Sequence, residues 1–226
     1  MKYIIIGLGN FGSSLAEKLT EQGNEVIGID TDMSKVDAFK ERITHTICMD
    51  ATDEFTVSGL PLKDTDVVVV AIGENQGANV MTTALFKSLK VKRLISKATN
   101  KIHKRVLQAI GVDEIVLPEE ESAERWSKKL CLRGMVNSFE LSNDYSIVQV
   151  NMPEKYSGKS ILDIKIKENY NLLVLTTISH SEVDTAIGKS RSVTNVKGLA
   201  DPHDILYKED ILVVYGANKD IQRFLK

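Results

Sequence analysis

The sequence predicts an α/β protein: a Rossmann-like, doubly wound parallel sheet followed by a second, smaller α+β domain. Strand-like apolar runs alternate with helical patterns up to residue 118, a glycine-rich turn follows the first run, and the pattern changes after Pro118. Such alternation implies right-handed crossovers and a parallel sheet covered on both faces.

The strands of the first domain are expected at residues 3–6, 25–29, 46–49, 66–71, 93–96 and 114–117. Its helices are expected near residues 14–22, 34–42, 75–89 and 101–109, with a weaker one after Asp53. The four valines at 67–70 fit a central strand that is buried on both faces.

A helix over residues 119–133 leaves the first domain. Its acids fall in the first turn and its cations in the last, as the helix dipole favours. Ala123, Trp126 and Leu130 form one apolar stripe, which either packs on its own sheet or contacts a second subunit. We place the two domains at residues 1–135 and 136–226.

The second domain has a different order of elements. Strands are expected at residues 146–151, 171–178 and 210–216, with a short helix within 158–164 and a terminal helix after 216. The polar segment 180–199 is predicted to be a mobile loop or an irregular hairpin.

Composition argues against several functional classes. The net charge is −2 and no basic stripe with interleaved aromatic residues occurs, which disfavours nucleic-acid binding. The longest apolar run, 67–72, is too short to span a bilayer, and no signal pattern begins the chain, so we expect a cytoplasmic protein. Cys48 and Cys131 are interpreted as buried reduced thiols rather than as a disulfide or metal ligands.

The first thirty residues carry a dinucleotide-binding pattern. Gly7 permits the tight turn after the first strand, Gly9 allows backbone to approach a pyrophosphate, and Gly12 allows the helix to pack closely on the sheet. Asp30 ends the second strand, where it would accept hydrogen bonds from ribose hydroxyls. No Lys or Arg follows it immediately, which favours the unphosphorylated ribose that NAD, ADP and ATP share.

Motifs in both halves of the chain resemble the RCK (regulator of potassium conductance) family, of the TrkA and KtrA type. The resemblance rests on residues 6–12, 28–32, 49–53, 71–73, 96–100, 111–119, 156–163 and 205–216. It implies a cytoplasmic gating subunit with a TrkA-N and a TrkA-C domain, which regulates a membrane-embedded potassium channel or transporter of the Trk or Ktr type. It also implies dimers assembled into a ring, and NAD(H) or ADP/ATP as ligand. A divalent cation and, in the second domain near residues 172–176, cyclic di-AMP are further ligands of some members.

The resemblance also implies which residues bind the nucleotide. Beyond Gly7, Gly9, Phe11, Gly12 and Asp30, the matching positions are Thr31, Asp32, Asp50, Ala51, Ile72, Gly73, Glu74, Lys97, Ala98, Thr99, His103 and Glu119. Glu119 is also the position of a metal-holding carboxylate in some members. This chain departs from the family at Asn10, where some ATP-responsive members have an arginine; a neutral amide cannot make the charge-assisted contact of a guanidinium to a terminal phosphate.

Simpler interpretations accompany three of these positions. His103 is a solvated surface residue or a ligand contact, Asp50 caps the helix after Asp53, and Glu119 is a favourable first-turn acid. The four histidines form no recognisable catalytic pair, so we predict a non-enzymatic switch. The alternatives are a small NAD(P)-dependent oxidoreductase and a nucleotide sensor with another partner.

Overall fold

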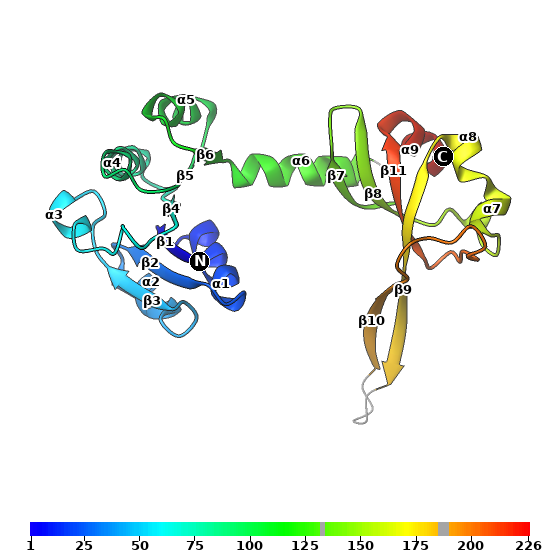
Figure 1. Cartoon of the computed structure of the whole chain (residues 1–226), viewed down its shortest axis with the longest axis horizontal. Helices are drawn as coiled ribbons and strands as arrows, with labels where there is room; N and C mark the ends of the chain where they lie inside the picture. The colour runs from blue at the N-terminus through cyan, green and yellow to red at the C-terminus, as the bar shows by residue number, and fades with distance from the viewer. Residues whose placement is uncertain (132–133, 185–189) are drawn as a thin grey trace. The chain divides into compact units, whose positions relative to one another are not determined.

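The computed structural model describes residues 1–131, 134–184 and 190–226, and it divides into two compact units, Met1–Glu121 and Ser122–Lys226 (Figure 1). In the first unit strands and helices alternate. The strands are β1 (Lys2–Ile6), β2 (Glu25–Asp30), β3 (His45–Cys48), β4 (Val67–Val70), β5 (Leu94–Lys97) and β6 (Glu114–Val116). The helices are α1 (Asn10–Glu21), α2 (Met33–Phe39), α3 (Glu54–Val57), α4 (Gln76–Ser88), α5 (Lys101–Ile110) and α6 (Pro118–Cys131), which continues into the second unit.

The sheet of the first unit is parallel throughout, in the order β3-β2-β1-β4-β5-β6. Every residue of the central strand β4 is buried. Apolar cores lie on both faces: one includes Ala16 and Val36 from α1 and α2, and the other includes Phe86 from α4. The strand order reverses between β1 and β4, and in sheets of this topology the ligand crevice opens at the carboxyl ends of these strands.

Short polar side chains cap the N-termini of four helices in the first unit. Asp32 accepts a hydrogen bond from the Ser34 amide at 2.9 Å, and Asp53 caps α3 in the same way. The side chains of Asn75 and Asn100 accept hydrogen bonds within the first turns of α4 and α5. These caps satisfy amide groups that a helix leaves free at its first turn, so they fix where each helix starts.

The second unit is built on an antiparallel sheet in the order β10-β9-β11-β8-β7. Its strands are β7 (Met135–Glu140), β8 (Tyr145–Asn151), β9 (Leu173–Asp184), β10 (Ser190–Val196) and β11 (Ile211–Ala217). Its helical segments are the 3₁₀ turn η1 (Glu154–Tyr156), α7 (Ile161–Ile164), α8 (Ile166–Tyr170) and α9 (Asn218–Leu225). Their apolar side chains form one core with the sheet, in which Leu172, Leu212 and Phe224 are buried.

The structure differs from the sequence prediction mainly in the second unit. Strand β7 and helix α8 were not predicted. The segment 180–199 was expected as a loop or irregular hairpin; the described part forms β10 and the end of β9, paired from Ile178↔Val196 to Asp184↔Ser190. This Ser- and Thr-rich polar sequence forms strands because the antiparallel pairing provides hydrogen-bond partners for its backbone N–H and C=O groups.

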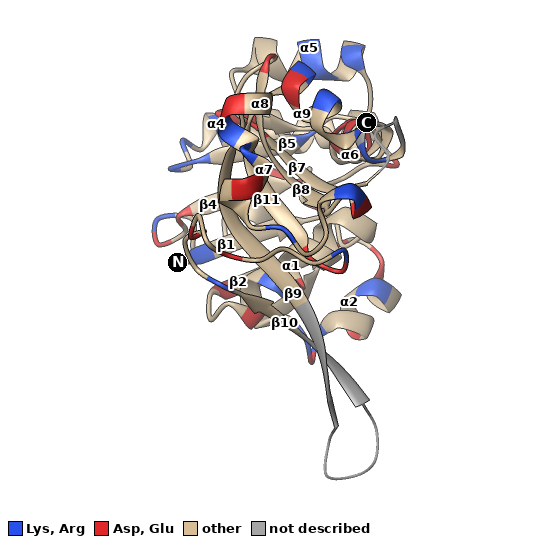
Figure 2. Cartoon of the chain, turned by 90° about the vertical axis from the view of Figure 1, so that its right-hand side faces the viewer, with Lys and Arg blue, Asp and Glu red and all other residues tan. Residues whose placement is uncertain are grey.

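The prediction that Cys48 is a buried thiol was wrong: the residue is exposed, and its Sγ lies 3.5 Å from the Thr31 carbonyl oxygen. It ends the edge strand β3, where burial is incomplete. The side chain of Cys131 lies outside the described part of the chain. Lys, Arg, Asp and Glu are interspersed over the described elements (Figure 2), and none of the described helices has the length and apolar character needed to cross a membrane.

Candidate functional site

A cavity of about 1040 Å³ lies at the carboxyl ends of the strands of the first unit. The β1–α1 turn, the ends of β2, β3, β4 and β5 and the first turns of α4 and α6 contribute to its walls. The predicted binding residues that line it are Gly7, Gly9, Asn10, Phe11, Asp30, Thr31, Asp50, Ala51, Ile72, Gly73, Glu74, Lys97, Thr99 and Glu119.

Two glycines of the β1–α1 turn are required by the protein itself. Gly7 has φ +97°, and a Cβ there would lie 2.9 Å from the Ile72 amide nitrogen. A Cβ at Gly12 would lie 1.9 Å from the Gly7 carbonyl oxygen, so helix and turn touch backbone to backbone. Gly9 is the N-cap of α1 and offers no capping side chain, which leaves first-turn N–H groups available to an anion.

The Asp30 carboxylate is fixed beside this turn. Its Oδ2 accepts the Leu8 amide at 2.7 Å, and its Oδ1 accepts the Asp32 amide at 3.0 Å. A carboxylate has about four lone-pair sites, so two remain for ribose hydroxyls. One side chain therefore both shapes the glycine turn and presents acceptors to the cavity.

A cation and an acid meet in the cavity wall, near Phe11 of the glycine turn. The Lys97 Nζ, on a side chain that is 11% exposed, donates to Glu119 Oε1 at 2.7 Å and lies 5.9 Å from the centre of the Phe11 ring. The hydrogen bond from Lys97 lowers the pKa of the Glu119 carboxyl below its ordinary value. A buried ammonium beside the glycine turn suits the phosphates of a nucleotide, because it supplies charge where they would lie.

The metal role implied for Glu119 has less support. Its carboxylate is already paired with Lys97, and among the described residues no three His, Cys, Asp or Glu side chains cluster in a way that could hold a metal ion. These residues alone therefore do not fit a divalent cation.

Four predicted binding residues do not line the cavity: Gly12, Asp32, Ala98 and His103. Gly12 packs against the turn, and Asp32 caps α2, where hydrogen bonds from Ser34 lower the pKa of its carboxyl. Ala98 is fully buried, and His103 is 3% exposed. His103 is thus neither the surface residue nor the direct cavity-lining contact that the sequence suggested.

Sequence reasoning missed several residues at the site. Lys35 and Phe39 reach the cavity from α2, and Asn75 and Met81 from α4. Lys35 lies in the first turn of α2, shortly after Asp30 in the chain, so a cation at this position was detectable from its spacing to Asp30. The buried Asn79, by contrast, gave no signal, since the sequence does not show whether an amide on a helix is buried or exposed.

Comparison with known proteins gives three kinds of match. The family model described as "TrkA-N domain" matches residues 3–118. "Ktr system potassium uptake protein C" of Bacillus subtilis is 35% identical over 225 residues, covering 100% of this chain and 96% of the relative. "Ktr system potassium uptake protein A" of the same organism is 33% identical over 223 residues, covering 99% and 95%.

Solved structures match the fold. The structure described as "Crystal Structure of the GsuK RCK domain" has a TM-score of 0.64 at 15% identity, and the match covers 99% of this chain and 47% of the other. "GsuK channel bound to NAD" has a TM-score of 0.63 at 15% identity, covering 99% and 39%. This chain therefore spans less than half of each GsuK chain.

Proposed function

Because the chain belongs to the TrkA-N domain family, we propose that it is a nucleotide-binding regulatory subunit that controls potassium uptake through a separate membrane-embedded subunit. The similarity to two potassium uptake proteins over almost their whole length supports the transport role. The observation that carries the nucleotide role is the cavity at the strand-order reversal, with the glycine turn, Asp30 and Lys97 around it.

The ligand is an adenine nucleotide with at least two phosphates, of the NAD(H) or ADP/ATP type. Asp30 would accept the ribose hydroxyls, the first turn of α1 would receive the pyrophosphate, and Lys97 would neutralise phosphate charge. Asp50, Thr31 and Ala51 line the adenosine side of the cavity. Asn10 provides no positive charge, so a terminal phosphate would be stabilised less here than it would be beside an arginine.

The mechanism is a shift between two conformations. A nucleotide that binds one conformation more tightly moves the equilibrium by the difference in binding free energy, and no reacting group is needed. The Lys97–Glu119 pair connects the cavity to the first turn of α6, so a change at the phosphates reaches this helix. We propose that α6 carries the change towards the second unit.

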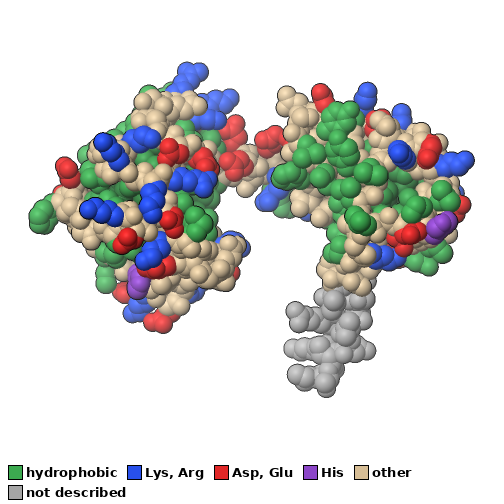
Figure 3. Space-filling model, viewed as in Figure 1, with side chains coloured by type: hydrophobic (Ala, Val, Ile, Leu, Met, Phe, Trp, Pro, Cys, Tyr) green, Lys and Arg blue, Asp and Glu red, His purple; other side chains and the backbone are tan. Residues whose placement is uncertain are grey.

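Assembly is proposed to involve a second copy of the chain, and pairs of subunits to form a ring beneath the membrane subunit. Trp126 and Leu130 on α6 are 52% and 76% exposed. Hydrophobic side chains also gather on the visible face of the second unit (Figure 3). The exposed large hydrophobic residues on the strands of this unit include Phe139, Tyr145 and Tyr215. Apolar surfaces of this kind favour association.

The second unit is proposed to bind its own effector along residues 172–176, with cyclic di-AMP, calcium and sodium as candidates. The full-length chain should then show a shift in thermal unfolding with one of the three. Equal unfolding curves with all of them would contradict an effector of these classes.

Potassium uptake tests the functional proposal. A transport-deficient cell carrying a cognate membrane subunit should take up potassium in a nucleotide-dependent way only when this chain is also expressed. Equal uptake with and without the chain, for every neighbouring pore tried, would refute the regulatory role. Calorimetry with purified protein tests nucleotide binding separately.

An oxidoreductase is the alternative, because the fold also serves hydride transfer. It requires a proton donor or acceptor near the nicotinamide end of the cavity. The side chains that line this end include Glu74, Lys97 and Glu119. Stoichiometric NADPH retained on purification, together with catalytic turnover, would favour the enzyme over the switch.

A further inference from the structure

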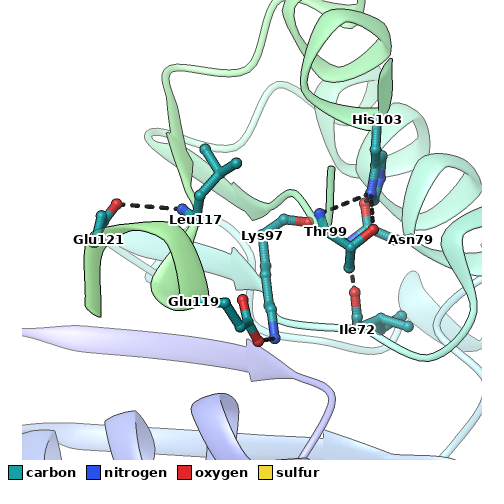
Figure 4. A network of polar contacts seen from close by, with 8 residues as sticks. All are labelled: Ile72, Asn79, Lys97, Thr99, His103, Leu117, Glu119 and Glu121. Atoms are coloured by element: carbon teal, nitrogen blue, oxygen red, sulfur yellow. Dashed lines mark hydrogen bonds and ion pairs between the residues drawn. The ribbon is translucent and has the colours of Figure 1, made fainter. Parts of the chain in front are cut away.

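A buried polar network lies directly behind the cavity, between β4, β5, α4 and α5 (Figure 4). Its centre is Asn79 on α4, whose side chain is fully buried. The Asn79 Nδ2 donates to the Ile72 carbonyl oxygen at 2.9 Å and to the Lys97 carbonyl oxygen at 3.2 Å. Ile72 follows β4 and Lys97 ends β5, and both line the cavity. One amide group therefore ties together two neighbouring strand ends that form part of the cavity wall.

The hydrogen-bond pattern fixes the orientation of this amide. Since Nδ2 makes both of its hydrogen bonds to carbonyl oxygens, Oδ1 must be the acceptor in the remaining contacts. Ser96 Oγ donates to Oδ1 at 3.2 Å, and His103 Nε2 lies 3.0 Å from it. His103 must therefore carry its hydrogen on Nε2.

The other ring nitrogen of His103 reaches the cavity wall. With the hydrogen on Nε2, the neutral ring has its lone pair on Nδ1, which accepts the Thr99 amide at 3.4 Å and lies 3.3 Å from Thr99 Oγ1. Thr99 lines the cavity. A second proton on Nδ1 would face the Thr99 N–H, so that donor would lose its acceptor. The new N–H would instead point towards Thr99 Oγ1, so the hydrogen bonds that hold the segment after β5 would change.

We propose that Asn79 and His103 are positioning residues of the nucleotide site, and that protonation of His103 weakens nucleotide binding. This inference rests on the proposed nucleotide function. Neither residue lines the cavity; Asn79 acts through the Ile72 and Lys97 backbone, and His103 acts through Asn79 and Thr99.

The surroundings of His103 keep it neutral near pH 7. Burial lowers the pKa of its imidazole below the ordinary value of 6.5. The groups that face the ring, Asn79 from α4 and Thr99 after β5, are uncharged. The nearby charged groups are Lys101 and Lys104 on its own helix and the Lys97 ammonium, which pairs with Glu119. The neutral form is therefore favoured, and His103 becomes protonated only as the pH falls through this lowered pKa.

The test measures NAD affinity by calorimetry at about pH 7.5 and pH 5.5. NAD is the probe because its pyrophosphate does not titrate in this interval, unlike the terminal phosphate of ADP. We expect the wild-type affinity to be lower at the lower pH, in proportion to the fraction of His103 that is protonated there. His103→Gln retains a side-chain N–H for Asn79 and cannot gain a proton, so its affinity should stay level. His45→Gln, at an exposed histidine on β3, is the matched control and should keep the wild-type pH profile.

A second pair of variants tests Asn79 at about pH 7.5. Asn79→Leu removes both donors at similar volume and should weaken NAD binding about 10-fold or more. Thr82→Val changes an equally buried polar residue of α4 whose hydroxyl has no hydrogen-bond partner among the described residues, and it should leave the affinity unchanged. If Asn79→Leu does not fold, the His103→Gln profile still decides the matter.

NMR of the His103 imidazole provides a readout that a merely structural role would not move. If protonation weakens binding, saturating NAD must lower the pKa of His103 further, by linkage. An unchanged pKa, a pH-independent wild-type affinity, or a sloping profile in His103→Gln would each overturn the positioning proposal. Absence of NAD and ADP binding at pH 7.5 would instead refute the proposed nucleotide function itself.

Discussion

Gly9 and Gly12 are predicted to respond to alanine substitution in opposite ways. A Cβ at Gly9 has no heavy atom of the surrounding protein within 4 Å, and its φ of −72° suits any residue. A Cβ at Gly12 would lie 1.9 Å from a backbone oxygen. We therefore expect Gly9 to serve the ligand and Gly12 to serve the fold.

The magnitudes follow from these contacts. Gly9→Ala gains about 0.4–1 kcal/mol by restricting the unfolded chain, and it loses a similar amount because alanine is a poorer N-cap, about 0.5–1 kcal/mol. Its stability should therefore stay within about 1 kcal/mol of wild type. With nucleotide bound, the new methyl group would lie where backbone approaches the pyrophosphate; overpacking of about 1–3 kcal/mol corresponds to roughly 5- to 150-fold weaker binding.

Gly12→Ala should instead unfold more easily. Backbone must shift by more than an ångström to admit the methyl group, so we expect a loss at or above the upper part of the overpacking range, about 3 kcal/mol. Scanning calorimetry measures both stabilities, and titration calorimetry with NAD and ADP measures both affinities. Unchanged nucleotide affinity in Gly9→Ala, or wild-type stability in Gly12→Ala, would refute this division of roles.

Three further predictions concern Asp30, the Lys97–Glu119 pair and the apolar stripe on α6. Asp30→Ala should weaken NAD and ADP alike by about 1–3 kcal/mol, because ribose donors and the Leu8 amide lose their acceptor; equal affinities would remove the ribose role. Lys97→Met should raise the pKa of Glu119 towards its ordinary value of 4.5, which carboxyl NMR measures. In the wild type, the pair stabilises the fold above pH 4.5, and this contribution is lost as the pH falls through the lowered pKa of Glu119. Trp126→Ala with Leu130→Ala should reduce the mass seen by light scattering; an unchanged mass would mean that this stripe is not an assembly surface.

The sequence was most informative where local rules decide the structure. The glycine turn, the valine strand 67–70 and the alternation of elements all follow from backbone geometry and burial, and the parallel sheet of the first unit was predicted correctly. Strand β10 was not identified as such, because its polar composition does not indicate pairing across the hairpin.

The site was predictable to the extent that chain order brings residues together. The resemblance assigned Asp30, Lys97 and the glycine turn to one nucleotide site, and the structure brings them to one cavity because parallel strands end at the same edge of the sheet. Asn79 and His103 were not assigned to a network because the two residues lie 24 positions apart in the chain, on different helices, and a buried amide looks like any other helical position. Long-range side-chain hydrogen bonds leave no periodicity to detect.

The two hydrogen bonds at Asp30 have a further consequence for selectivity. In the proposed nucleotide site, they would hold the carboxylate that accepts the ribose hydroxyls in place before any ligand arrives, so the adenosine half of the cavity would require little ordering when it is filled. Every adenine nucleotide would gain this contribution equally, and a contribution common to all ligands cannot separate them. Discrimination between nucleotides would then depend on the phosphate half, where Lys97 would exchange Glu119 for phosphate and each ligand would offer a different charge for that exchange.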